Sequence, residues 1–160
     1  MEGSRLQRGL ATLDIAVTPQ QEERLLKCLH ELLRWNKKVN LTSVTDIEEA
    51  VEKHIIGSLT LLPYLGQAGS LLDIGSGGGF PALPLKIMRP ELEVVSVDAV
   101  KKKILFQRHI ARALALGSFT AIHGRIESRP KTDALGKRFS VVTSRALSDL
   151  ETFLRWAKPF

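Results

Sequence analysis

The residues best suited to chemistry follow a short apolar run that ends at Ile74. There the chain breaks into glycine, with the sequence Gly75-Ser-Gly77-Gly-Gly79. Glycine adopts positive φ without strain and lets the backbone approach a ligand closely. A strand, a glycine turn and a helix N-terminus, in this order, hold nucleotide-like ligands in doubly wound α/β sheets. The sequence therefore predicts a nucleotide-like ligand on a loop that includes Gly75 and Gly77.

The glycine spacing distinguishes this loop from a dinucleotide-binding loop. The dinucleotide pattern needs Gly-x-Gly-x-x-Gly, but Phe80 stands where its third glycine would be. Asp73 precedes Gly75, and the form Asp-x-Gly-x-Gly-x-Gly resembles the first motif of S-adenosylmethionine-dependent methyltransferases. A loop without the pyrophosphate-binding spacing suits a cofactor without phosphate. We therefore expect S-adenosylmethionine as the cofactor, and a nicotinamide-dependent Rossmann oxidoreductase is the disfavoured alternative.

A second strand, predicted over residues 93–98, ends in an acidic residue. Asp98 lies 23 residues after Gly75, and an acidic side chain at this spacing can accept both hydroxyls of a ribose. The same carboxylate can instead cap the next helix. The two roles are compatible, so Asp98 is expected to bind the cofactor.

Two further strands are predicted, over residues 119–123 and 139–143. After the first, the backbone of Ile126 can meet an adenine edge, and Glu127 can instead pair with a neighbouring arginine. After the second, Arg145 can hold a carboxylate or a phosphate with its planar guanidinium. Since the carboxyl ends of parallel strands meet at the ligand-binding edge of such sheets, these residues join the expected site.

A helical segment precedes the predicted sheet. The sequence Thr18-Pro-Gln-Gln21 predicts a helix start with a capping box, and a second helix is predicted over residues 47–62. We therefore predict an N-terminal helical segment over residues 1–66 and an α/β domain over residues 67–160.

Composition indicates a basic protein of 160 residues, with a net charge of +6 and a pI of about 9.7. Such a charge suits a polyanionic partner such as RNA, although a merely soluble basic protein is the alternative. The single cysteine, Cys28, excludes a disulfide framework and is expected off the apolar face of its helix. The sequence shows no long apolar run and no signal-peptide start, so we expect a cytoplasmic protein without a membrane segment.

Two groups of lysines can either contact RNA or be ordinary surface residues. Lys37 and Lys38 can face an RNA substrate, whereas the asparagines and the threonine around them more often form turns. Lys101, Lys102 and Lys103 open a predicted helix, where their charge opposes the macrodipole. That conflict suggests contact with phosphates, but lysines splayed into water are the alternative.

Taken together, the sequence resembles the ribosomal RNA small-subunit methyltransferase G family, also called glucose-inhibited division protein B. The matching stretches are residues 35–44, 54–65, 72–98, 125–127 and 144–146. The resemblance implies a Rossmann-like class I methyltransferase sheet that uses S-adenosylmethionine and no metal to methylate N7 of a guanine in 16S ribosomal RNA. Carried over position by position, the family's cofactor contacts fall on Gly75, Phe80, Ile126, Glu127 and Arg145.

The chain departs from the family pattern in two residues and in length. Gly57 stands where the family usually has aspartate, and Ala82 stands where it often has glycine. Class I methyltransferases usually carry seven strands, whereas four are predicted here. The C-terminal strands are therefore expected to be missing, leaving an open strand edge and exposing apolar residues such as Phe153 and Trp156. A non-catalytic RNA-binding remnant is the alternative that this truncation suggests.

The implied reaction needs no general base, because N7 of guanine is an acceptor that carries no proton at neutral pH. We therefore expect catalysis by positioning and desolvation. Arg145 is the candidate catalytic residue, orienting either the cofactor carboxylate or the RNA. The expected partner is 16S ribosomal RNA or the small ribosomal subunit, with the target base unstacked and the protein acting as a monomer.

Overall fold

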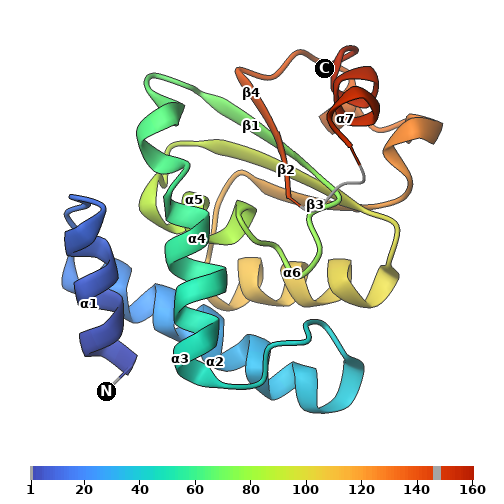
Figure 1. Ribbon diagram of the computed structural model, residues 1–160. Coiled ribbons are helices and arrows are strands. Elements are labelled where there is room, and N and C mark those ends of the chain that lie inside the picture. The colour runs from blue at the N-terminus through green and yellow to red at the C-terminus, as the bar shows by residue number, and fades with distance from the viewer. Residues whose placement is uncertain (1, 146–148) are drawn as a thin grey trace.

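A parallel sheet forms the centre of the computed structural model, which describes residues 2–145 and 149–160 (Figure 1). Within these residues the sheet has four strands, in the order β3-β2-β1-β4. The strands are β1 (Ser70–Ile74), β2 (Glu93–Asp98), β3 (Phe119–His123) and β4 (Val141–Ser144). The predicted α/β class and the four predicted strands are confirmed.

The register brings the ends of the strands to one edge. Leu72 of the central strand β1 is paired with Val95 of β2 on one side and with Val142 of β4 on the other. On β2, Asp98 is paired with His123 of β3. The carboxyl ends of all four strands therefore open onto the same side of the molecule, where the expected site residues lie.

Helices precede and connect the strands. The capping box at Thr18 is confirmed, since the Gln21 N–H donates to Thr18 Oγ1 over 3.2 Å and Gln21 Oε1 accepts from the Thr18 N–H over 3.0 Å. The α-helices are α1 (Glu2–Thr12), α2 (Pro19–Val39), α3 (Ile47–Ala50), α4 (Gly57–Leu59), α5 (Ala82–Met88), α6 (Lys101–Ala113) and α7 (Leu150–Ala157), and short 3₁₀ turns cover Leu62–Leu65, Ile126–Ser128 and Asp133–Leu135.

The helix predicted over residues 47–62 differs from a regular α-helix. A π-helical stretch, Val51–Ile56, joins α3 to α4. The Gly57 N–H donates to Glu52 O, five residues earlier, which is the hydrogen bond of a π turn. Hydrophobic periodicity does not distinguish a π turn from an α turn, so the sequence pattern predicted one continuous helix.

The two faces of the sheet have separate apolar cores. Leu71 and Val94 belong to a large cluster beneath α1–α6, whereas Leu72 and Val95 belong to a smaller cluster on the other face. Figure 1 shows α7 alone among the α-helices on this second face. The helical segment shares the large cluster with the sheet, and the division at residue 66 stays a prediction.

Two burial predictions were wrong. Cys28 lies on the buried face of α2, since several elements pack around that helix, and burial raises the pKa of its thiol to about 12. Phe153 and Trp156, which were expected to be exposed, are partly buried, because α7 packs them against the second core. The exposed apolar residues of α7 are Leu150 and Leu154, at 71% and 56% exposure.

Candidate functional site

The glycine loop leaves the carboxyl end of β1 and is hydrogen-bonded to β2. The Gly75 N–H donates to Val97 O over 2.8 Å. Gly75, Gly77 and Gly79 have φ values of 67°, 57° and 90°, in the region where a side chain is strained. A β-carbon at Gly79 would also lie 2.6 Å from Leu83 Cδ1. This backbone path therefore requires glycine.

Asp98 braces the loop from the end of β2. Its Oδ2 accepts from the Gly77 N–H over 2.8 Å, and its Oδ1 accepts from the Val100 N–H over 2.8 Å. The second bond goes to Val100, the N-cap residue of α6, so Asp98 orders the backbone before the helix but does not itself cap it. A carboxylate has about four acceptor positions, so these two bonds are compatible with the predicted ribose contact.

Gln107 supports the loop from α6, and no motif had pointed to it. Its side chain is fully buried, with Nε2 donating to Ser76 Oγ over 2.8 Å and to Gly77 O over 2.7 Å. Its Oε1 accepts from Ser96 Oγ over 2.5 Å. The available signal was a polar residue three positions from Ile104 on the buried face of α6, where a polar side chain must find partners.

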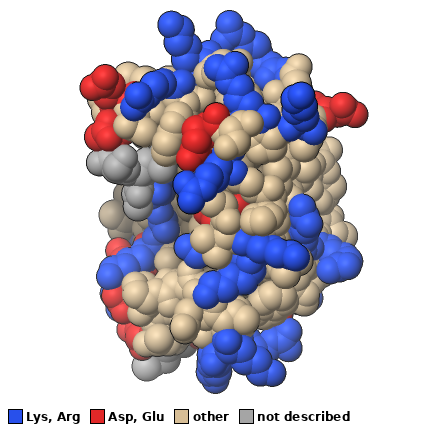
Figure 2. All heavy atoms as spheres, turned by 90° about the vertical axis from the view of Figure 1, so that its right-hand side faces the viewer, with Lys and Arg blue, Asp and Glu red and all other residues tan. Residues whose placement is uncertain are grey.

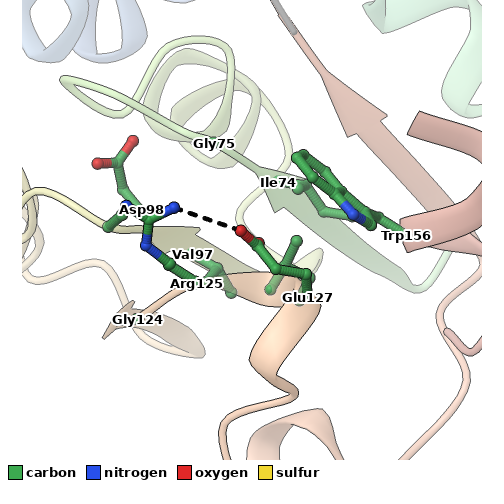
Figure 3. Close-up of a pocket in the computed structure, with 10 residues that line it drawn as sticks. Ile74, Gly75, Val97, Asp98, Gly124, Arg125, Glu127 and Trp156 are labelled. Atoms are coloured by element: carbon green, nitrogen blue, oxygen red, sulfur yellow. Dashed lines mark ion pairs between the residues drawn. The ribbon is translucent and has the colours of Figure 1, made fainter. Parts of the chain in front are cut away.

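A cavity of about 200 Å³ lies beside Asp98 at the ends of β1 and β2 (Figure 3). Glu127 borders it and pairs with Arg125 across 3.5 Å, the alternative that the sequence left open for this carboxylate. Trp156 of α7 borders the cavity next to Ile74. No sequence motif had predicted that Trp156 would lie there. The lining residues are Ile74, Gly75, Val97, Asp98, Ala99, Gly124, Arg125, Ile126, Glu127 and Trp156.

A second cavity, of about 270 Å³, adjoins the first. Gly75 and Asp98 line both cavities, and together the two volumes fall in the range of about 300–1,000 Å³ that is typical of small-molecule sites. The second is lined by Leu32, Leu41, Thr42, His54, Gly75, Ser76, Gly77, Gly78, Phe80, Asp98, Lys103 and Arg145. It therefore joins the glycine loop to the helical segment.

His54 connects Arg145 to that segment. Arg145 Nη2 lies 3.4 Å from His54 Nδ1, and Arg145 Nη1 donates to Lys53 O over 3.0 Å. His54 Nε2 lies 3.0 Å from Thr42 Oγ1, and the imidazole lies against Phe80 with ring centroids 5.0 Å apart and planes tilted by 33°. Burial, followed by the charge of Arg145, lowers the pKa of His54 to about 4. A neutral ring can accept from Arg145 at Nδ1 while donating from Nε2.

Asp73 is fully buried just before the cavity-lining residues Ile74 and Gly75. Neither of its carboxylate oxygens has a hydrogen-bond partner among the described residues. Burial raises the pKa of Asp73 to about 7, although the nearby Ala82 N–H and the Arg145 guanidinium oppose the shift. Asp73 lines neither cavity, so its contact with the cofactor stays a prediction.

The predicted site residues come together at this edge of the sheet. Seven of them line one cavity or both: Gly75, Gly77, Phe80, Asp98, Ile126, Glu127 and Arg145. Asp73 is buried directly behind the loop instead of lining it. Their roles toward a ligand stay predictions. Ala146, part of the matched stretch after β4, lies outside the described residues.

Basic side chains are spread over the face onto which the strand ends open. Figure 2 shows many lysines and arginines on this side and fewer acidic residues. Among the residues described, none of the helices has the length and apolar composition needed to cross a bilayer.

Comparisons with known proteins agree with the geometry. Residues 21–160 match the family model described as rRNA small subunit methyltransferase G. A ribosomal RNA small subunit methyltransferase G from Geobacter metallireducens is 46% identical over 154 residues, which make up 96% of this chain and 69% of that protein. The protein of the same name from Myxococcus xanthus is 41% identical over 156 residues, 98% of this chain and 71% of the other.

A solved structure supports the fold. The crystal structure of a putative O-methyltransferase from Klebsiella pneumoniae superposes with a TM-score of 0.53 at 22% sequence identity. The match covers 89% of this chain and 60% of that one. At this identity the likeness concerns the fold alone.

Proposed function

The chain belongs to the rRNA small subunit methyltransferase G family of S-adenosylmethionine-dependent enzymes, and we propose that it methylates N7 of a guanine in 16S ribosomal RNA. The observation that carries this proposal is the junction of two cavities at Gly75 and Asp98. Such a junction, at the carboxyl ends of neighbouring parallel strands, suits a nucleoside cofactor on one side and its substrate on the other.

The first cavity is proposed to hold the adenosine part of the cofactor. The two remaining acceptor positions of Asp98 suit the ribose hydroxyls, and the backbone of Ile126 suits the adenine edge, with Glu127 beside it. The glycine loop and the buried Asp73 suit the methionine part. When bound, S-adenosylmethionine supplies an electrophilic methyl group on a sulfonium.

The second cavity is proposed to receive the target guanine. The His54 and Phe80 rings form one wall, and Arg145 is held by Lys53 O and His54. Since N7 carries no proton at neutral pH, the residues of this cavity need to hold the base in line and exclude water, and no proton acceptor is required. Arg145 acts as the catalytic residue by orienting the RNA or the cofactor carboxylate.

A ribosomal RNA substrate indicates where the chain acts and with which partner. We propose that the chain acts as a monomer in the cytoplasm on 16S ribosomal RNA or on the small subunit. Sedimentation at micromolar concentration checks the monomer, since a dimer would sediment at twice the mass.

The first test is calorimetric titration with S-adenosylmethionine, using the wild-type chain, Asp98→Ala and the exposed control Asp133→Ala. Loss of ribose contacts should weaken binding at least about tenfold in Asp98→Ala, because hydrogen bonds to a charged group contribute about 1.5–3 kcal/mol each. Asp133→Ala should bind like the wild type. A folded wild-type chain that binds RNA but no cofactor would leave the RNA-binding remnant instead.

The second test locates the methylated atom. A 16S ribosomal RNA transcript with ordinary guanosine should accept radiolabelled methyl groups, whereas a transcript made with 7-deazaguanosine should accept none. Equal labelling of both transcripts would rule out N7 as the acceptor.

A further inference from the structure

Two lysine groups that lie far apart in the sequence meet at one end of a helix pair. The Trp35 ring of α2 lies 5.5 Å from the Phe106 ring and 5.1 Å from the His109 ring of α6. Nearer the other end, Arg24 of α2 donates to the carbonyl of Leu114, just after α6. The two helices therefore run antiparallel. The last turn of α2 lies beside the first turn of α6.

We name the lysines at this common end the lysine surface, which consists of Lys37, Lys38, Lys101, Lys102 and Lys103. The first four are exposed and Lys103 is half-buried. None of the ion pairs within the described residues involves them. The surface thus gathers five positive charges that are not neutralised by ion pairing. Lys101, Lys102 and Lys103 lie at the positive end of the α6 dipole, whereas Lys37 and Lys38 lie in the last turn of α2, where cations are favourable. The three lysines of the first α6 turn cost stability unless an anion is bound.

A groove with an aromatic floor continues the lysine surface along α2. It has a volume of about 380 Å³ and is lined by Arg34, Trp35, Lys38 and Val39. Arg34 pairs with Glu31 over 2.6 Å. Lys38 is therefore the cation beside Trp35 that no ion pair among the described residues occupies. An aromatic ring next to such a cation suits single-stranded nucleic acid, because bases stack on the ring and phosphates pair with the cation.

The lysine surface also reaches the candidate site. Lys103 lines the second cavity together with Phe80 and Arg145, and so does Leu32 from the α2 turn before the groove. A strand whose guanine enters that cavity would therefore pass directly over the end of the helix pair. The basic side chains of this face are visible in Figure 2.

We propose that the lysine surface and the Trp35 groove bind the single-stranded RNA that flanks the target guanine. The phosphates pair with the five lysines, and one flanking base stacks on Trp35. This inference rests on the proposed function, since it concerns the same RNA substrate. It adds which elements hold the strand outside the reaction site.

The test is the salt dependence of RNA binding by a variant in which Lys37, Lys38, Lys101 and Lys102 are all replaced by alanine. Each phosphate contact with a single strand contributes about 0.7 to the slope of log affinity against log salt. Losing four contacts should lower the slope by about 3 and weaken binding on the order of 10²–10³-fold at about 0.1 M salt. Lys103 is kept, because it lines the reaction cavity.

A control removes charge from the same two helices away from the lysine surface. Lys27→Ala with Arg112→Ala changes exposed residues on α2 and α6, and this double variant should keep the wild-type salt slope. Thermal unfolding of the quadruple lysine variant should stay close to that of the wild type. Removing Lys101 and Lys102 from a first helical turn is favourable, whereas removing Lys37 and Lys38 from the last turn of α2 is unfavourable. An affinity loss at unchanged stability is a result that a merely structural role of these lysines would not give.

Stacking of a base on Trp35 is tested by fluorescence and not by substitution, because Trp35→Ala would also remove the packing of Trp35 on Phe106. In a Trp156→Phe background, Trp35 is the only remaining tryptophan, and its fluorescence should be quenched by a single-stranded RNA oligonucleotide. An unchanged salt slope in the quadruple variant would overturn the lysine surface, and unchanged fluorescence would overturn the stacked base. If either negative result occurs while the wild-type chain still binds S-adenosylmethionine, the proposed function stands. If the folded wild-type chain does not bind S-adenosylmethionine, the proposed function itself is refuted.

Discussion

Replacing Gln107 with leucine removes the support of the glycine loop while keeping a side chain of similar size. The change deletes the bonds from Nε2 to Ser76 Oγ and Gly77 O and the bond from Ser96 Oγ to Oε1. The serine hydroxyls and the carbonyl are then left in buried surroundings, since Ser96 is fully buried and Ser76 is 2% exposed.

The magnitude follows from the number of partners. A hydrogen bond contributes about 1 kcal/mol net, and a buried group left without a partner costs about 1–3 kcal/mol. Because the hydroxyls can rotate toward other acceptors, we expect a loss of about 2–5 kcal/mol for Gln107→Leu. For a chain of this size each kcal/mol corresponds to roughly 2–4 °C, so the midpoint of unfolding should fall by about 4–20 °C.

Thermal unfolding followed by circular dichroism measures this loss, and calorimetry should show weaker binding of S-adenosylmethionine because the loop is less ordered. Gln67→Leu, at an exposed position before β1, is the control and should unfold within about 2 °C of the wild type. If Gln107→Leu also stayed within that margin, the loop would not depend on these bonds and the reasoning would be refuted.

Three further predictions concern the same site. Burial raises the pKa of Asp73 to about 7, so the folded state holds a proton that the unfolded state loses above about pH 4. The free energy of unfolding should therefore decrease as pH rises from about 4 to about 7. In Asp73→Asn this decrease should be absent, as measured by urea unfolding from pH 4 to 8. Gly79→Ala should cost several kcal/mol, about 1–2 from its φ of 90° and more from the clash with Leu83, and an unchanged urea midpoint would contradict this. His54→Asn keeps an acceptor near Nδ1 for Arg145, whereas His54→Phe keeps only the ring; the first should retain more kcat than the second at equal cofactor affinity, and equal rates would exclude a positioning role.

Sequence patterns predicted the elements whose causes are local. The capping box at Thr18 and the second strand up to Asp98 follow from residues adjacent in the chain, and both are confirmed. The glycine pattern also predicted the loop, and the structure gives the local reason, since the backbone at Gly79 requires glycine. Such features have short-range physical reasons, and a single sequence contains them.

The residues that were missed owe their roles to neighbours far along the chain. Gln107 reaches a loop about 30 positions earlier, and His54 meets Arg145 across 91 positions. Trp156 borders the first cavity only because α7 packs on the second face of the sheet. No local pattern distinguishes these side chains from ordinary core residues, since tertiary packing alone gives them their partners.

The order of the strands also has a consequence for how the chain is made. The central strand β1 pairs with β2, which follows closely, and with β4, which follows about 70 residues later. At roughly 5–20 residues per second of synthesis, the 47 residues from Val95 of β2 to Val141 of β4 take about 2–10 s to emerge. During that interval one side of β1 has no hydrogen-bonding neighbour. The nascent chain therefore passes through a period in which its apolar central strand is open to pairing with other chains, and chaperones that bind extended apolar segments are expected to act then.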